Sequence, residues 1–200
     1  MPTSRTLRMF TAVIPPSEVL AELSDRLDML RPLAPAARWT DPDAWHVTTS
    51  FMGTVFPRLV DELIGALETA TASLTPFDVT LRAGGAFPNP ASARQLWVGL
   101  LDPDARLARL AGAARGAAMQ VGVPVDRKKF TAHLTLARFR APHDCDQLIA
   151  QMSDFQSSPW RVDQLYLFES QLGKGSGGRP RHQVIQRFNL GVPEKPGAPG

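Results

Sequence analysis

Apolar residues recur along the chain at two spacings, one typical of strands and one of helices. Residues 8–14 (RMFTAVI) form a short apolar run that a pair of prolines ends, which predicts a strand. Ser17 follows as a candidate cap for a helix that runs to about residue 30. Its apolar stripe repeats every three or four residues, at Leu20, Leu23, Leu27 and Leu30.

The same alternation of strand and helix patterns continues to about residue 190. Helices are predicted over 57–72, from 102 to a terminating glycine at 122 and over 144–152, and strands over 45–51, 77–81, 96–100, 130–137, 160–168 and 183–190. The strands come in pairs between helices, which favours an α+β fold with mixed or antiparallel sheets over a doubly wound parallel sheet. Because no linker interrupts the pattern, we expect one domain over residues 7–190. The aperiodic tail 191–200 is expected to be disordered.

Composition narrows the class of protein. The chain has 200 residues, a net charge of +3 and one cysteine, Cys145, which excludes an internal disulfide and a four-cysteine zinc site. No segment approaches the roughly 20 apolar residues of a membrane span, and the first apolar run is too short for a signal peptide. We therefore expect a cytoplasmic protein without a membrane partner. Most basic residues are arginines, which suit phosphate, but a charge of +3 fits a solvated surface equally well.

A short motif occurs twice, as His46-Val47-Thr48 and as His133-Leu134-Thr135. Side chains alternate along a strand, so each histidine should share a face with its threonine. Continued alternation would add Ser50 and Ala137 to those faces and would send the apolar neighbours into the core.

Histidine can give or take a proton near neutral pH, so a facing pair can act as general base and general acid. The two threonine hydroxyls, Thr48 and Thr135, could hold the non-bridging oxygens of a phosphate, and such chemistry requires no metal or other cofactor. A single strand histidine is more often structural. Two copies in matching contexts indicate a site.

The flanking sequence resembles the two-histidine phosphoesterase superfamily, and within it the RNA 2′,3′-cyclic phosphodiesterases, also called 2′-5′ RNA ligases. The resemblance covers about residues 7–190. Its marks are RMFTAVIPP, RWTDPDAWHVTTSFMGTV, GAFPNPASARQLWVGL, FTAHLTLARF and LYLFESQLGKGSGGRPRHQVIQRFNL. It implies a bilobal α+β fold with a pseudo-twofold cleft, and metal-independent hydrolysis of a 2′,3′-cyclic phosphate at an RNA end to a 2′-phosphomonoester. Ligation would be the reverse direction.

Carried over by position, the resemblance makes His46 and His133 the catalytic pair and Thr48 and Thr135 the phosphate donors. It favours His133 as the base and His46 as the acid, although the symmetry of the two motifs leaves this order open. Arg138 matches an arginine that contacts phosphate in relatives. Strand parity sets it opposite His133, so it reaches the cleft only if the strand ends or bulges.

The sequence departs from the family pattern at two positions, and several residues have alternative roles. Ala132 stands where relatives have proline, and His182 stands where an aromatic residue is expected; it would stack on a base or lie on the surface of a strand. Four aromatic residues are candidates for stacking a base or packing in the core: Phe10, Trp45, Phe51 and Phe130. The expected partner is RNA bound by a monomer. The alternatives are a phosphodiesterase for a small cyclic nucleotide or sugar cyclic phosphate, and a non-catalytic module that binds RNA ends.

Overall fold

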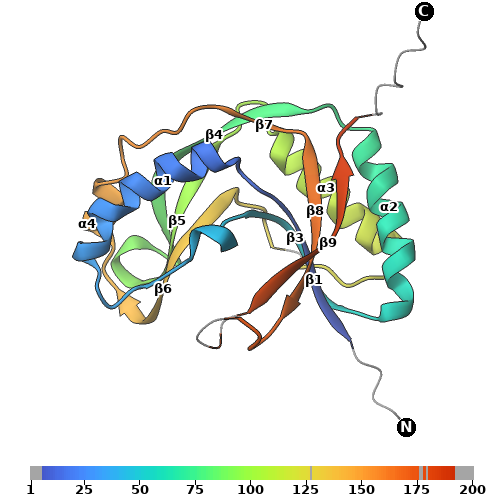
Figure 1. Cartoon of the computed structure of the whole chain (residues 1–200), viewed down its shortest axis with the longest axis horizontal. Helices are drawn as coiled ribbons and strands as arrows, with labels where there is room; N and C mark the ends of the chain where they lie inside the picture. Colours follow the sequence, from blue (N-terminus) through green and yellow to red (C-terminus); the bar gives the residue numbers. More distant parts are fainter. Residues whose placement is uncertain (1–5, 127, 176–177, 179, 192–200) are drawn as a thin grey trace, which may run out of the picture.

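The computed structural model describes residues 6–126, 128–175, 178 and 180–191, and it is an α+β fold (Figure 1). The strands of the described part are β1 (Leu7–Val13), β2 (Arg38–Trp39), β3 (Val47–Val55), β4 (Phe77–Phe87), β5 (Ala93–Leu101), β6 (His133–His143), β7 (Trp160–Val162), β8 (Gln164–Gln171) and β9 (Arg181–Asn189). The helices are α1 (Ser17–Leu30), α2 (Val60–Ala72), α3 (Arg106–Gln120) and α4 (Asp146–Ala150). Short 3₁₀ turns cover Arg31–Leu33, Pro42–Ala44, Pro57–Leu59 and Pro90–Ser92.

The described strands form one nine-stranded sheet in the order β7-β4-β5-β6-β3-β1-β8-β9, with β2 on the side of β6. Every strand pairing is antiparallel. The order reads symmetrically from its centre, because β6, β5, β4 and β7 on one side correspond to β3, β1, β8 and β9 on the other. The two sides meet at one pair, Val47 and Leu134. The predicted α+β fold is confirmed, and this pairing joins the two expected sheets into one.

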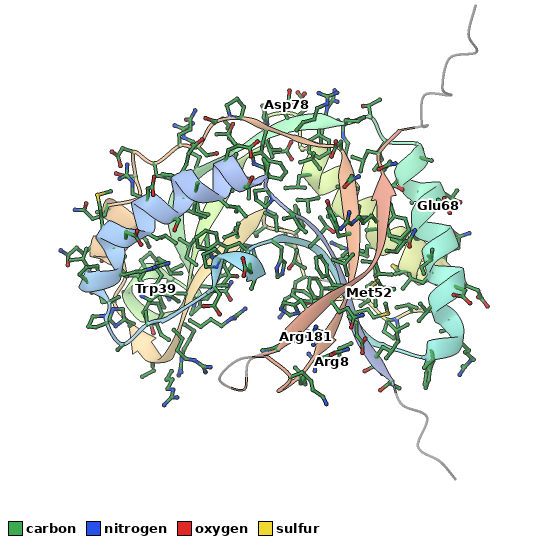
Figure 2. All side chains as sticks on the ribbon, in the orientation of Figure 1. Arg8, Trp39, Met52, Glu68, Asp78 and Arg181 are labelled. Carbon is green, nitrogen blue, oxygen red and sulfur yellow. The ribbon has the colours of Figure 1, made fainter. Side chains whose placement is uncertain are left out.

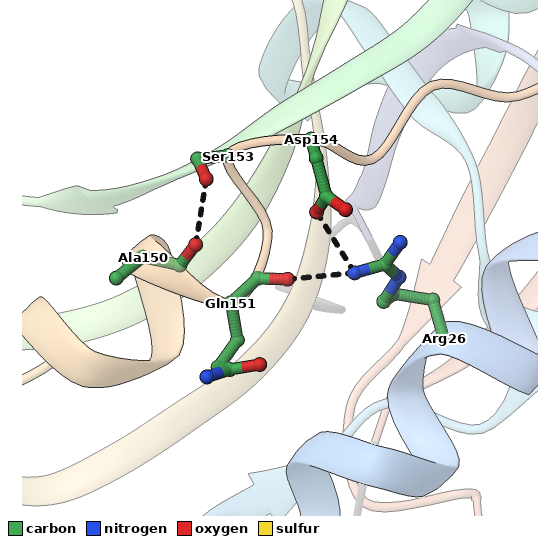
Figure 3. Close-up of polar contacts among 5 residues, drawn as sticks. All are labelled: Arg26, Ala150, Gln151, Ser153 and Asp154. Carbon is green, nitrogen blue, oxygen red and sulfur yellow. Dashed lines mark hydrogen bonds and ion pairs between the residues drawn. The ribbon is translucent and has the colours of Figure 1, made fainter.

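The sheet has two halves. We call the half with β2, β4, β5, β6 and β7 the β4–β6 lobe, and the half with β1, β3, β8 and β9 the β1–β9 lobe. The helices lie outside both lobes (Figure 1). Helix α2 packs against α3 and β9, and α3 also packs against β3, so both cover the β1–β9 lobe. Helix α1 follows β1 in the chain but lies over the β4–β6 lobe. Arg26 on α1 donates to the Gln151 carbonyl at 2.9 Å and to Asp154 at 3.0 Å, beyond α4 (Figure 3).

The predicted helix boundaries hold best where the apolar stripe is regular. Helix α1 spans the predicted 17–30, but the Ser17 hydroxyl contacts Glu18 and does not cap the helix. Helix α3 begins at Arg106, later than predicted, and the Asp102 carboxylate before it accepts from the backbone N–H groups of Arg106 and Leu107 at 2.9 and 2.8 Å. The predicted strand 160–168 is divided into β7 and β8. The disordered tail predicted for 191–200 falls on residues that, after 191, lie outside the described part.

Strand β6 carries a bulge that changes which residues face the space between the lobes. Leu96 pairs with Ala137 whereas Trp97 pairs with Thr135, so Leu136 is an extra residue opposite β5. Leu136 and Ala137 are both fully buried. The prediction that Ala137 shares the face of His133 is therefore wrong, because the bulge resets the alternation and returns Arg138 to that face.

Strand β3 repeats this irregularity at the equivalent position. Thr11 pairs with Ser50 and Ala12 pairs with Thr48, which leaves Thr49 as the extra residue. Thr49 and Ser50 are both buried, and Phe51 is 55% exposed. Ser50 lines the same cavity as His46 and Thr48, but its side chain is buried, because the bulge changes the alternation before it. The two bulges make Phe51 the structural counterpart of Arg138.

Candidate active site

All five residues predicted for the site, His46, Thr48, His133, Thr135 and Arg138, line one cavity of about 1400 Å³. Its walls come from both lobes, as the positions of Trp39 and Arg8, which both line it, show in Figure 2. The antiparallel pairing of β3 with β6 brings the two motifs together, although 87 residues separate the histidines in sequence. The geometry thus assembles the predicted set in one place.

His46 lies directly before β3, and its orientation is set by the backbone. Its Nδ1 lies 2.8 Å from the carbonyl of Ala44, which can only accept, so Nδ1 carries the proton and Nε2 is left with its lone pair. The pKa of His46 is lowered to about 4, mainly by burial and in smaller part by the nearby charges of His182, Arg138 and His133, whereas the Ala44 carbonyl opposes the shift. His46 is therefore a neutral imidazole at neutral pH.

His133 opens β6 and repeats this arrangement. Its Nδ1 lies 2.7 Å from the Thr131 carbonyl, which again leaves Nε2 unprotonated in the neutral ring. Burial lowers the pKa of His133, and Arg138 lowers it further, while the bond to Thr131 raises it. Phe87 meets the ring edge-on at 5.1 Å, and Trp97 lies 6.1 Å away. The indole of Trp97 occupies the place where a side chain at Gly85 would stand, so the glycine permits this close packing.

Arg138 and Thr135 are held by a residue that the motif analysis did not single out. The Arg138 guanidinium donates to Oε1 of Gln95 at 2.9 Å, and Nε2 of Gln95 donates to the Thr135 hydroxyl at 2.8 Å. The same Nε2 lies 3.3 Å from Nε2 of His133. Gln95 was missed because it is a single polar residue directly before the predicted strand 96–100. Only the observed pairing of β5 with β6 places it beside Thr135, His133 and Arg138.

The wall beside His46 is aromatic instead. Phe10 lies 5.0 Å from the His46 ring and stacks on Phe168 at 5.0 Å. His182 meets both His46 and Phe10 edge-on, at 5.5 and 5.0 Å, so it belongs to the site wall; the alternative of a plain surface position does not hold. Its Nδ1 is buried without a hydrogen-bond partner in the described part of the chain. Phe51 extends this wall into the cavity.

The remaining candidates divide between the cavity and the core. Trp45 is buried in the core, whereas Phe130 lines the cavity. Basic side chains from both lobes also line the cavity: Arg8, Arg38, Arg115, Lys128 and Lys129. The cavity therefore presents positive charge around the two motifs.

Metal ligands do not cluster in the part of the chain that the structure describes. Among those residues, no three His, Cys, Asp or Glu side chains gather closely enough to hold a metal ion.

No helix of the described part is long and apolar enough to cross a bilayer.

The fold and the paired motifs place the chain in a known class. It belongs to the 2′-5′ RNA ligase superfamily, whose family model matches residues 15–174. Among curated relatives, the RNA 2′,3′-cyclic phosphodiesterase of Aquifex aeolicus is 25% identical over 178 residues, covering 88% of this chain and 93% of the relative. The Archaeoglobus fulgidus RNA 2′,3′-cyclic phosphodiesterase is 29% identical over 136 residues, covering 67% and 73%. The sequence-based family resemblance is confirmed.

Solved structures show the same fold. The protein TT0787 of Thermus thermophilus superposes with a TM-score of 0.74 at 26% identity, covering 92% of this chain and 98% of that one. LigT of E. coli in its apo form gives a TM-score of 0.75 at 23% identity, covering 94% and 100%. The bilobal architecture is thus shared along nearly the whole chain.

Proposed function

We propose that this protein hydrolyses the 2′,3′-cyclic phosphate at an RNA end to a 2′-phosphomonoester, without a metal. The observation that carries the proposal is the pair of histidines, each anchored through Nδ1 to a backbone carbonyl and each followed by a threonine that lines the same cavity. The curated relatives, both named for this activity, support the same substrate.

The reaction needs only groups that line the cavity. One histidine takes a proton from water as the water attacks phosphorus, and the other protonates O3′ as the bond between phosphorus and O3′ breaks. The 2′ ester bond stays, so the product is the 2′-phosphomonoester, and the proton taken up balances the proton given. Thr48, Thr135 and Arg138 would donate to the non-bridging oxygens, where negative charge must be stabilised.

One of the two histidines must be protonated before the pair can act as general acid and general base. Both histidine pKa values lie below 6.5, so both rings are neutral at neutral pH, the form that a base needs. The acid must gain a proton, and an anionic phosphate bound between the rings favours this by attraction. In a 2′-5′ ligation, a 5′-hydroxyl would attack phosphorus in place of water, the bond between phosphorus and O3′ would again break, and the same groups would transfer the protons.

The size of the cavity favours an RNA end over the small cyclic phosphates considered as an alternative. Sites for small ligands enclose about 300–1,000 Å³, whereas this cavity measures about 1400 Å³ and carries basic side chains from both lobes. These features suit a terminal nucleotide with further phosphates behind it. We also propose that the protein is monomeric and cytoplasmic, as expected from the sequence.

The test is an RNA oligonucleotide that ends in a 2′,3′-cyclic phosphate, incubated with the protein in chelator. We expect conversion to the 2′-phosphomonoester, and we expect His46→Ala and His133→Ala each to lower turnover by a factor on the order of 10²–10⁴. His143→Ala is the control, because His143 stacks on Phe139 outside the cavity.

Other results would point to the alternatives. Equal turnover of a mononucleotide 2′,3′-cyclic phosphate and of the oligonucleotide would favour a small-molecule phosphodiesterase. Tight binding of the cyclic end without any product would favour a binding module. Wild-type turnover in both folded histidine variants would remove the acid–base pair from the proposal.

A further inference from the structure

Gln95 connects three residues of the proposed site from the neighbouring strand. It lies on β5 opposite Arg138 of β6, and its side chain lines the cavity. Its amide reaches the Arg138 guanidinium at 2.9 Å, the Thr135 hydroxyl at 2.8 Å and Nε2 of His133 at 3.3 Å. Gln95 is thus the common partner of a predicted base, a predicted phosphate donor and a predicted phosphate-binding cation.

The direction of the amide follows from the chemistry of its partners. A guanidinium can only donate, so the atom that faces Arg138 must be the carbonyl oxygen, Oε1. The NH₂ group then faces Thr135 and His133 and donates to both. Arg138 thus fixes the rotamer and the orientation of Gln95.

Two consequences follow for the reacting groups. Because the Thr135 oxygen accepts from Gln95, its own hydroxyl proton is free to be donated to a phosphate oxygen. The approach of an N–H donor to Nε2 of His133 is favourable only while that nitrogen carries a lone pair, which is the state a general base requires. Gln95 therefore favours the neutral ring of His133 and directs the hydroxyl proton of Thr135 away from the amide.

The other lobe lacks this network. The pairing of Phe10 with Phe51 on β1 and β3 corresponds to the pairing of Gln95 with Arg138 on β5 and β6. At the position of the amide, the His46 side thus carries a phenyl ring, which can neither donate nor accept in this way. The two lobes share a backbone plan but differ in polarity around their histidines.

We propose that Gln95 is a positioning residue that holds Thr135, His133 and Arg138 in the arrangement used for phosphate, and so distinguishes the His133 half of the cleft from the His46 half. The inference rests on the proposed function. Gln95 acts through its three partners, and its loss should impair the chemical step more than substrate binding.

The experiment replaces the amide with a side chain of similar length that makes no such bonds. Gln95→Met should lower kcat on the cyclic-phosphate RNA by about 10–100-fold with a much smaller change in KM, as removal of supporting partners does elsewhere. Gln164→Met is the matched control. Gln164 is also a half-buried strand glutamine, bonded to Asn189 and Tyr166, but it does not line the cavity.

A second readout needs no activity. The ring protons of His133, followed by NMR as pH is varied, should titrate at higher pH in Gln95→Met, because the donor that favours the neutral ring is gone. Arg138 and His46 are the charged or titratable neighbours of His133, and the positive charge of Arg138 acts to lower the pKa of His133. Gln95→Glu, which keeps an acceptor for Arg138 and adds a negative charge, should move the titration upward further.

Each result bears on the inference. Lower kcat together with a raised His133 titration supports it, provided that the thermal unfolding midpoint matches that of Gln164→Met. An unchanged His133 titration overturns it, whatever happens to kcat, because the amide would then be only structural. If wild-type protein does not cleave the cyclic phosphate, the proposed function fails, and the titration still decides the role of Gln95. If Gln95→Met does not fold, Gln95→Leu, which also removes the donor without adding a charge, carries the same titration test.

Discussion

The two histidines share one anchor and differ in what surrounds the rest of the ring. Each donates from Nδ1 to the carbonyl of the residue two positions earlier, Ala44 or Thr131. This local bond orients the ring without help from the other lobe. Beyond it, His46 contacts the rings of Phe10 and His182, whereas His133 contacts the amide of Gln95 in addition to the ring of Phe87. The two rings are thus oriented alike but have different neighbours, which allows one histidine to act as base and the other as acid.

The burial of His46 makes protein stability depend on pH. Its pKa is about 4 in the folded protein and about 6.5 when unfolded, so the unfolded state binds more protons between these values. This contribution is complete above pH 6.5 and is lost as pH falls toward 4, at a cost of up to about 3 kcal/mol. Urea unfolding from pH 7 to pH 4 should show this loss, and His46→Asn should reduce the slope by about one proton.

His143→Asn provides the comparison, because His143 lies outside the cavity. Its slope should match that of the wild type. If His46→Asn keeps the full wild-type slope, then His46 is not the group that titrates.

At the scale of elements, two β-bulges decide which side chains enter the cavity. Each bulge follows the threonine of a motif and adds one residue to its strand, so the residue five positions after the histidine faces the cavity. In β6 that residue is Arg138, and in β3 it is Phe51. One lobe thereby presents a cation for phosphate, and the other presents an exposed ring with Phe10 behind it.

The exposed ring of Phe51 is suited to stack on a nucleobase, which elsewhere contributes about 1–3 kcal/mol per base. Phe51→Ala should therefore raise KM for the cyclic-phosphate RNA on the order of tenfold and leave the unfolding midpoint unchanged. Phe56→Ala is the control, because Phe56 is also exposed, at 38%, but does not line the cavity. Equal KM values for the two variants would show that Phe51 does not stack on the base.

At the scale of the molecule, each lobe is built from segments distant in sequence. Strand β1 pairs with β3 and with the distant β8, β8 pairs with β9, and α1 packs over strands that the chain forms only from residue 77 onward. The contact of Arg26 with Gln151 and Asp154 links positions 125 and 128 residues apart. We therefore propose that residues 7–190 fold as one unit.

Substitutions on helix α1 test whether the two lobes unfold together. Leu23 is fully buried, so Leu23→Ala should cost about 2–5 kcal/mol, whereas Met29→Ala on the same helix, 62% exposed, should cost less than about 0.5 kcal/mol. Urea unfolding of Leu23→Ala should show one transition, coincident by tryptophan fluorescence and circular dichroism. Two separate transitions would mean that the lobes fold independently.

The sequence by itself determined the elements and the chemistry of the two motifs. Apolar periodicity is local, so α1 was predicted with its observed bounds. The His-x-Thr spacing is also local, because side-chain alternation over three residues needs no partner strand.

Tertiary structure decided what lies beyond those three residues. Strict alternation placed Ser50 and Ala137 toward the cleft and Arg138 away from it, and the bulges reversed this for Ala137 and Arg138 and buried Ser50. A bulge is defined by the register between two strands, and here those strands are distant in sequence. The same holds for Gln95 and His182, which reach the histidines only through strand pairing and ring contacts between distant segments. The local His-x-Thr pattern therefore identified the proposed reacting groups, and pairing between distant strands determined which residues surround them.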